Sequence, residues 1–268
     1  MDETCARCGR RLDGVPVGKR CPTCGAKRRI NELQLGGEVR PAGALAIAIR
    51  SYFSTYLLWS AWHEGALAQR VEDAHEGKSR FDWAHRGHVL AGVFAAVGFL
   101  EALINEQFQD AHDGHRSSIS NLGQEANSRM ALVWQTTGGR GQVLEKYDWS
   151  LAATDRAQMD RGGEPYQSAR LVVKLRNDIA HYRPEQVSAA WEHPMNALRG
   201  RFPENRLMSG SGNAWWPDHC LGAGCVAWAA SSAERFANHI CAAVGISPNY
   251  QHLEKSLGTS WRQSATNP

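Results

Sequence analysis

The segment HVLAGVFAAVGFLEALINEQFQDA, residues 88–111, carries the strongest fold signal in the chain. Its apolar side chains recur at spacings of three and four and make a wide apolar face: Leu90, Val93, Phe94, Val97, Leu100, Leu103, Ile104 and Phe108. A face of this width is typical of a helix that packs against several neighbours. We therefore expect residues 88–111 to form the central helix of the core.

Further helices are predicted on both sides of this central segment, at residues 42–76, 128–160, 165–182 and 218–245. The polar, Gly/Ser-rich stretch at 112–128 is expected to be a loop. Pro184 should end the helix before it, because proline cannot continue a helix. Strand-like alternation is scarce outside the N-terminal cysteine segment. The pattern predicts an all-α helical bundle preceded by a small cysteine module.

Domain boundaries follow from Gly, Pro and composition shifts. The stretch NELQLGGEVRPAG, with its glycine pair and Pro41, is typical of a linker. The predicted organisation is a zinc ribbon, a linker, a helical domain and a C-terminal tail, at residues 1–30, 31–44, 45–245 and 246–268. Hydrophobic residues make up 43% and charged residues 21% of the chain, which excludes a disordered or fibrous protein.

The longest apolar run, residues 89–100, has 12 residues, whereas a membrane-spanning helix needs about 20. No membrane span is therefore expected. The N-terminal MDETCARC has neither the basic start nor the apolar stretch of a secretory signal. We expect a cytoplasmic protein, and in the cytoplasm paired cysteines more often bind metal than form disulfides.

Two CxxC pairs stand near the N-terminus with 12 residues between them: Cys5, Cys8, Cys21 and Cys24. Four thiolates at this spacing suit one tetrahedral zinc ion, and iron is the alternative metal. Gly9 and Gly25 follow the second cysteine of each pair, where they let the backbone turn tightly. Four sulfur ligands leave no open coordination position, so we expect a structural zinc ribbon that folds on its metal.

Positive charge is concentrated in this module. Residues 1–30 carry eight Lys or Arg and three Asp or Glu, a net charge of +5, whereas the remainder carries 22 basic and 24 acidic residues. This asymmetry favours a polyanionic partner such as nucleic acid. No GxSxG, GxxxxGK or GxGxxG motif is present, so the sequence gives no support to serine hydrolase, P-loop or Rossmann readings.

The stretch ARLVVKLRNDIAHYRPE, residues 169–185, combines an apolar stripe with a polar, basic face. On an ideal helix that face groups four side chains within about 60°: Arg170, Lys174, Asn177 and His181. Asn177 and His181 are four apart and therefore neighbours. Arg176 lies about 140° round from His181, so it reaches the same cleft only through its long side chain or from another subunit.

This segment resembles the signature of the HEPN superfamily of helical domains, in which an Arg and a polar residue are followed by a His after four to six intervening positions. Here these are Arg176, Asn177 and His181. FLEALINE, residues 99–106, looks like the second-helix motif of that superfamily, and CVAWAASSAERF, residues 225–236, looks like its final helix. The resemblance covers roughly residues 45–245.

The resemblance implies a metal-independent endoribonuclease of the toxin or antiviral-defence kind, active as a homodimer with the two motifs facing each other across a composite cleft. In that reading His181 takes the proton of the ribose 2′-hydroxyl and returns one to the leaving oxygen. Arg176 binds the scissile phosphate, and Asn177 orients the imidazole or the phosphate. The expected products are a 2′,3′-cyclic phosphate and a 5′-hydroxyl, and an inhibitor or antitoxin is an expected partner.

One departure concerns that antitoxin. Members of the superfamily that pair with nucleotidyltransferase antitoxins have a Tyr two positions after the His. Here Tyr182 follows directly and Arg183 takes that position. The departure argues against that particular mechanism of inhibition.

Other interpretations stay open at this stage. Polar and charged residues at a helix end also offset the helix dipole, so the chain could be a non-catalytic module that binds nucleic acid or protein. A zinc-ribbon transcription regulator is disfavoured by the acidic main domain. Glu101 and Asn105 could reach the proposed cleft, although a solvated or capping role is favoured. His219 stands near two cysteines, but the adjacent Trp pair indicates packing.

Overall fold

The computed structural model of the chain describes residues 3–5, 12, 15, 19–25, 29–31, 50–74, 77, 79–116, 118–184, 193–251 and 253. The chain divides into two compact units, Met1–Ser51 and Tyr52–Pro268.

The N-terminal unit contains a two-stranded antiparallel sheet of β1 (Glu3–Cys5) and β2 (Arg29–Asn31), in which Cys5 lies opposite Arg29. Leu12 and Cys21 are buried together in this unit, and Val15 and Cys24 pack against them. The sheet therefore joins the two ends of the cysteine module, and an apolar cluster forms around its second cysteine pair.

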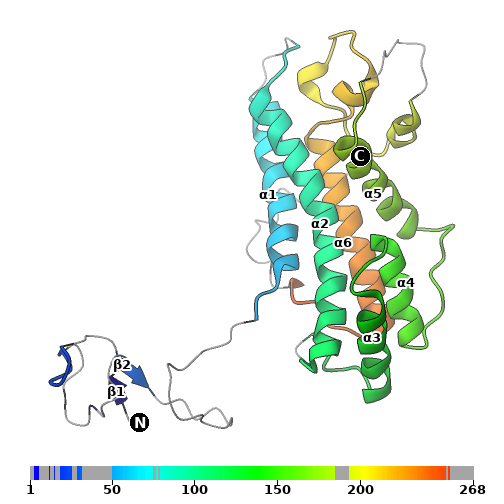
Figure 1. The fold of residues 1–268 in the computed structure, drawn as a ribbon. Helices are drawn as coiled ribbons and strands as arrows, with labels where there is room; N and C mark the ends of the chain where they lie inside the picture. Colours follow the sequence, from blue (N-terminus) through cyan, green and yellow to red (C-terminus); the bar gives the residue numbers. More distant parts are fainter. Residues whose placement is uncertain are drawn as a thin grey trace. The chain divides into compact units, whose positions relative to one another are not determined.

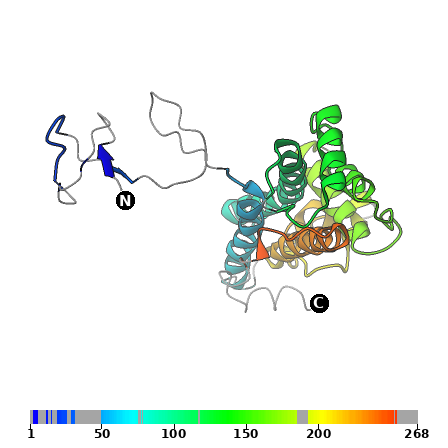
Figure 2. The same cartoon turned by 90° about the horizontal axis from the view of Figure 1, so that it is seen from below.

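The second unit is helical, which confirms the prediction of an all-α fold. Its long helices are α1 (Phe53–Asp73), α2 (Trp83–Asp113), α3 (Gln124–Thr137), α4 (Val143–Ala153), α5 (Tyr166–Ala180) and α6 (Ala223–Val244). Short helical turns η1 (Pro194–Leu198), η2 (Arg206–Met208) and η3 (Trp215–His219) lie between α5 and α6. The helices lie side by side as a bundle (Figures 1 and 2), and the described residues of this unit include no strand.

Helix α2 is the centre of the bundle and contacts α1, α3, α4, α5 and α6. Close packing against α6 depends on Gly92, because a Cβ at this position would lie 2.3 Å from Cγ1 of Val226. Gly98 similarly receives the side chain of Leu57 from α1. Among the described helices, only α2 is long and apolar enough to cross a bilayer, and 56% of its most apolar window is buried, as in a core helix.

Helix boundaries differ from the predicted ones for local reasons. Helix α2 begins at Trp83 and not near residue 88, because the side chain of Asp82 caps it by accepting a hydrogen bond from the backbone N–H of His85 at 2.9 Å. Helix α1 begins at Phe53, whereas the predicted helix began at residue 42. Residues 42–49 lie outside the described part of the chain.

A buried carboxylate joins three of the helices. Glu72, near the end of α1, accepts a hydrogen bond at 2.7 Å from the backbone N–H of Ala223, the first residue of α6. It also lies 2.9 Å from Nε2 of His85 in α2, and both side chains are almost fully buried. Since the N-cap residue of α6 is Gly222, which has no side chain, Glu72 supplies the acceptor that this helix start requires.

Candidate functional site

Helix α5 carries the motif that sequence analysis singled out. It packs on α6 and α2 through the buried side chains of Leu171, Val172 and Leu175, and it lies beside α6 in Figure 1. The helix ends at Ala180, ahead of Pro184. The apolar stripe therefore faces the core and leaves the opposite, polar face at the surface.

The three motif residues lie at the C-terminal end of this helix. Arg176 and Asn177 are half-buried, and His181 is exposed at the C-cap position. The backbone N–H of His181 donates to the carbonyl of Asn177 at 2.9 Å, so the residue that carries the imidazole is held at the end of the helix. The structure thus brings His181 close to Asn177 through the backbone.

The side chains of the motif are not joined to one another by a hydrogen bond or an ion pair. Within the described chain, no hydrogen bond or ion pair involves the side chain of Arg176, Asn177 or His181. Their basic neighbours are engaged instead, since Lys174 pairs with Asp178 at 2.6 Å and Arg170 bonds Gln167. One copy of the chain therefore presents the three groups separately and leaves each of them open to a ligand.

Glu101 and Asn105 of α2, for which a solvated or capping role was favoured, instead contact a lysine of α4. Nζ of Lys146, from α4, donates to Oδ1 of Asn105 at 2.9 Å and lies 3.5 Å from Oε1 of Glu101. The Lys146 side chain is only 3% exposed. Sequence reasoning missed this lysine, because no spacing rule links α4 to α2. Glu101 and Asn105 thus stabilise a buried ammonium group.

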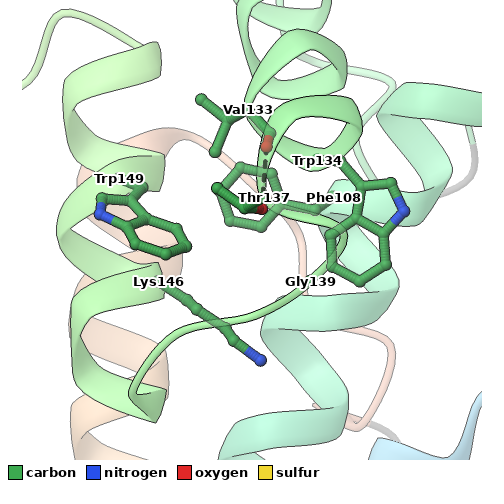
Figure 3. Close-up of a pocket in the computed structure, with 7 residues that line it drawn as sticks. All are labelled: Phe108, Val133, Trp134, Thr137, Gly139, Lys146 and Trp149. Carbon is green, nitrogen blue, oxygen red and sulfur yellow. Dashed lines mark hydrogen bonds between the residues drawn. The ribbon is translucent and has the colours of Figure 1, made fainter.

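A small indentation lies beside Lys146, with an empty volume of about 150 Å³ that includes open solvent. Figure 3 shows the residues that line it: Phe108, Val133, Trp134, Thr137, Gly139, Lys146 and Trp149. The turn between α3 and α4 passes so close to the indole of Trp134 that a Cβ on Gly139 would lie 2.7 Å from that ring. The motif of α5 contributes no residue to this hollow, so the two features are distinct.

Two buried cysteines of the helical unit, Cys220 and Cys241, are poor nucleophiles. Burial raises the pKa of Cys241 to about 11, although a hydrogen bond from Gln107 opposes the shift. Burial and the neighbouring Cys225 thiol raise the pKa of Cys220 well above its usual range. Both thiols stay protonated at neutral pH, and a protonated thiol neither attacks nor ligates metal. They therefore act as packing groups, as the adjacent Trp pair suggested.

Only part of the predicted zinc site lies in the described residues. Gly25 adopts a φ of 73°, and its N–H donates to the carbonyl of Cys21 at 2.9 Å, so residues 21–25 form a tight turn that carries Cys21 and Cys24. A turn of this kind suits two ligands of one ion. Cys8 and the side chain of Cys5 lie outside the described residues. No group of three metal-binding side chains occurs among the residues described, so the four-cysteine set stays a prediction.

Comparisons with known proteins do not extend this picture. The chain matches no family model, no curated protein and no solved structure. The fold and the site together define an all-α domain with an exposed histidine at the end of a core helix.

Proposed function

We propose that the helical unit is a metal-independent endoribonuclease of HEPN type that acts in the cytoplasm as a toxin or antiviral-defence effector. The observation that carries the proposal is the end of α5, where an exposed His181 follows Asn177 by one turn and Arg176 stands beside them. Among the described residues, these three groups, which suit phosphate chemistry, have no side-chain hydrogen bond or ion pair.

Each group has a role that its chemistry supports. The imidazole of His181 accepts the proton of the ribose 2′-hydroxyl as that oxygen attacks the phosphorus, and a protonated imidazole returns a proton to the leaving 5′-oxygen. Arg176 binds the phosphate and stabilises its developing charge with two parallel hydrogen bonds. Asn177 orients the imidazole or the phosphate. The products are a 2′,3′-cyclic phosphate and a 5′-hydroxyl.

A homodimer is part of the proposal. Residues at the spacing of Arg176 and His181 point about 140° apart on an ideal helix, so Arg176 reaches the phosphate beside His181 either through its long side chain or from a second copy, and we favour the second copy. Two copies related by a twofold axis would face each other with the same surface, and Arg176 of one copy could then meet His181 of the other. RNA is the proposed substrate, and an inhibitor or antitoxin would restrain it.

The N-terminal module is proposed to be a structural zinc ribbon that helps to hold RNA. Its net charge of +5 suits a polyanion, and the described turn at Cys21 and Cys24 suits two of the ligands. Elemental analysis of the purified chain should give one zinc per chain, and Cys21→Ser should lower that content. A chain that folds fully without zinc or iron would contradict the assignment.

The nuclease proposal is tested by incubating purified wild-type and His181→Ala protein with total RNA in EDTA and mapping the cleaved ends. Wild type should leave 2′,3′-cyclic phosphate ends, and His181→Ala should not. His239→Ala removes an exposed histidine elsewhere on the unit and serves as the matched control. Equal cleavage by wild type and His181→Ala would refute the role of His181, and RNA binding without cleavage would indicate a non-catalytic binding module.

A further inference from the structure

The segment between α5 and α6 holds a second polar cluster, made by Glu204, Ser211 and His219. Oγ of Ser211 lies 3.4 Å from Nε2 of His219. The other ring nitrogen, Nδ1, lies 3.5 Å from Oε2 of Glu204. The hydroxyl therefore lies at one ring nitrogen of the imidazole and the carboxylate at the other. A nucleophile and an orienting acid lie on these two sides of the basic histidine in acyl-transfer enzymes.

The donors and acceptors of these three side chains are compatible with proton transfer from Ser211 to His219. A carboxylate on Nδ1 favours the tautomer that carries its proton there, which leaves Nε2 free to accept from the hydroxyl. Oγ of Ser211 itself accepts a hydrogen bond from the backbone N–H of Asn213 at 3.1 Å, so its own proton is directed elsewhere. Contacts of 3.4–3.5 Å are long, as they often are in catalytic sites without substrate.

The base and the acid are positioned from the core by Asn205, which is 2% exposed. The backbone N–H of Asn205 donates to the carbonyl of His219 at 2.8 Å, and its side-chain amide donates to the carbonyl of Asp218 at 3.0 Å. Glu204 precedes this anchor in the chain, and its second oxygen accepts from Nε1 of Trp215 at 2.7 Å. Both ends of the Glu204–His219 contact are thus tied to buried groups.

The serine sits on a short loop that is also held in place. Its backbone N–H donates to the carbonyl of Met208 at 3.0 Å, and the side chain of Asn213 bonds Asp218 at 2.9 Å. Asp218 in turn pairs with Arg86 of α2 at 3.1 Å. The loop is therefore connected to the central helix of the bundle through two successive contacts, Asn213–Asp218 and Asp218–Arg86.

Access to the serine is open. Ser211 is half-buried between Gly210 and Gly212, which both adopt a φ of 71° and have open space where a side chain would stand. Among the described residues, the backbone N–H of Gly212 has no hydrogen-bond partner. A free N–H beside the nucleophile is the kind of donor that stabilises an oxyanion.

We propose that Ser211 is a nucleophile toward small activated carboxylic esters, with His219 as its general base and Glu204 as a positioning residue. Oγ bonds to the carbonyl carbon while its proton passes to Nε2 of His219. The bond from that carbon to the leaving oxygen breaks, and the leaving group takes a proton from the imidazolium. Water then attacks the acyl-serine in the same way, which releases the carboxylate and restores the serine.

The full chain is tested with a fluorophosphonate probe, which phosphonylates an activated serine with loss of fluoride, and the modified peptide is located by mass spectrometry. Wild type should be labelled at Ser211, and Ser211→Ala should not be labelled. Ser209→Ala, which removes an exposed hydroxyl two residues away, should be labelled like wild type. A folded wild-type chain that stays unlabelled, or labelling that persists in Ser211→Ala, would overturn the proposal.

The roles of the other two residues have separate readouts. His219→Ala should slow labelling by about 10²–10⁴-fold, and added imidazole should restore part of the rate. Glu204→Gln should also slow labelling, while Glu204→Asp should keep more of the wild-type rate at an unchanged thermal midpoint. An equal labelling rate for wild type and His219→Ala would overturn the assignment of His219 as the general base. Because His181 lies outside this cluster, His181→Ala should leave labelling intact, which separates this result from that of the ribonuclease proposal.

Discussion

The end of α5 and the segment at 204–219 arrange catalytic residue types in opposite ways. Arg176, Asn177 and His181 lie within six residues of sequence, yet no hydrogen bond or ion pair joins their side chains in the described chain. Ser211 and His219 are eight residues apart, yet they contact each other and the carboxylate of Glu204. Nearness in sequence and nearness in space are therefore different signals. Under the two proposals, the α5 motif needs a ligand or a second copy to bring its groups together, whereas the groups of the Ser211 cluster already lie together in one copy.

The largest expected effect is a crossed loss of two activities. His181→Ala should lower RNA cleavage by about 10²–10⁴-fold and leave serine labelling unchanged, because a general base contributes rate enhancement of that size. His219→Ala should do the reverse. Both variants are measured in both assays. If either substitution lowers both activities while the protein stays folded, the two regions are not independent sites.

A smaller effect is expected at Arg176. Arg176→Lys keeps the positive charge but loses the paired hydrogen bonds of the guanidinium, so RNA cleavage should fall on the order of 10²-fold. Arg170→Lys, on the exposed face of the same helix, is the matched control and should change cleavage little. The comparison is made under single-turnover conditions. Equal activity of wild type and Arg176→Lys would show that charge alone is sufficient at this position.

Stability should distinguish the two regions as well. Asn205→Ala removes a buried amide that bonds the carbonyls of Asp218 and Leu221, so the free energy of unfolding should fall by about 3 kcal/mol. Asn177→Ala removes a half-buried amide that has no hydrogen-bond partner among the described residues, so it should change the free energy of unfolding by less than about 0.5 kcal/mol. Urea unfolding measures both. A large loss for Asn177→Ala would mean that the α5 motif serves the fold.

The smallest effect is expected at the ion pair of α5. Lys174→Ala removes a partly exposed i,i+4 contact with Asp178, which should cost about 0.3–0.5 kcal/mol of unfolding free energy. The same variant should reduce RNA affinity if Lys174 leaves Asp178 to contact a phosphate. An affinity equal to that of wild type, read from filter binding at low salt, would confine the site to the three motif residues.

Much of the helical architecture was predictable, because periodicity reports burial directly. The apolar face at 88–111 predicted the central helix, and Pro184 predicted the end of α5. The start of α2 was missed, since the side-chain cap from Asp82 is a local polar signal within an otherwise charged stretch. The capping of α6 by Glu72 was also beyond prediction, because it joins residues 151 positions apart.

The candidate sites also differ in how far sequence spacing alone could predict them. The α5 motif was visible because it is contiguous and belongs to one helix, so helical geometry alone relates its members. Lys146 was missed because its partners come from another helix. The Ser211 cluster was missed for a further reason, since it lies on a loop and lacks the GxSxG elbow that a motif search looks for. Loop conformations depend on contacts such as those of Asn205, which no spacing rule encodes.

The carboxylate of Glu72 also has a consequence for the order in which the protein forms during synthesis. Helices α1 and α2 leave the ribosome early and can pair as a hairpin, but the first turn of α6 is made 151 residues after Glu72. Until then Gly92 faces no Val226, and the carboxylate lacks its backbone donor. The nascent chain therefore holds an incomplete core with exposed apolar surface until α6 emerges, which is the period in which it depends most on chaperones.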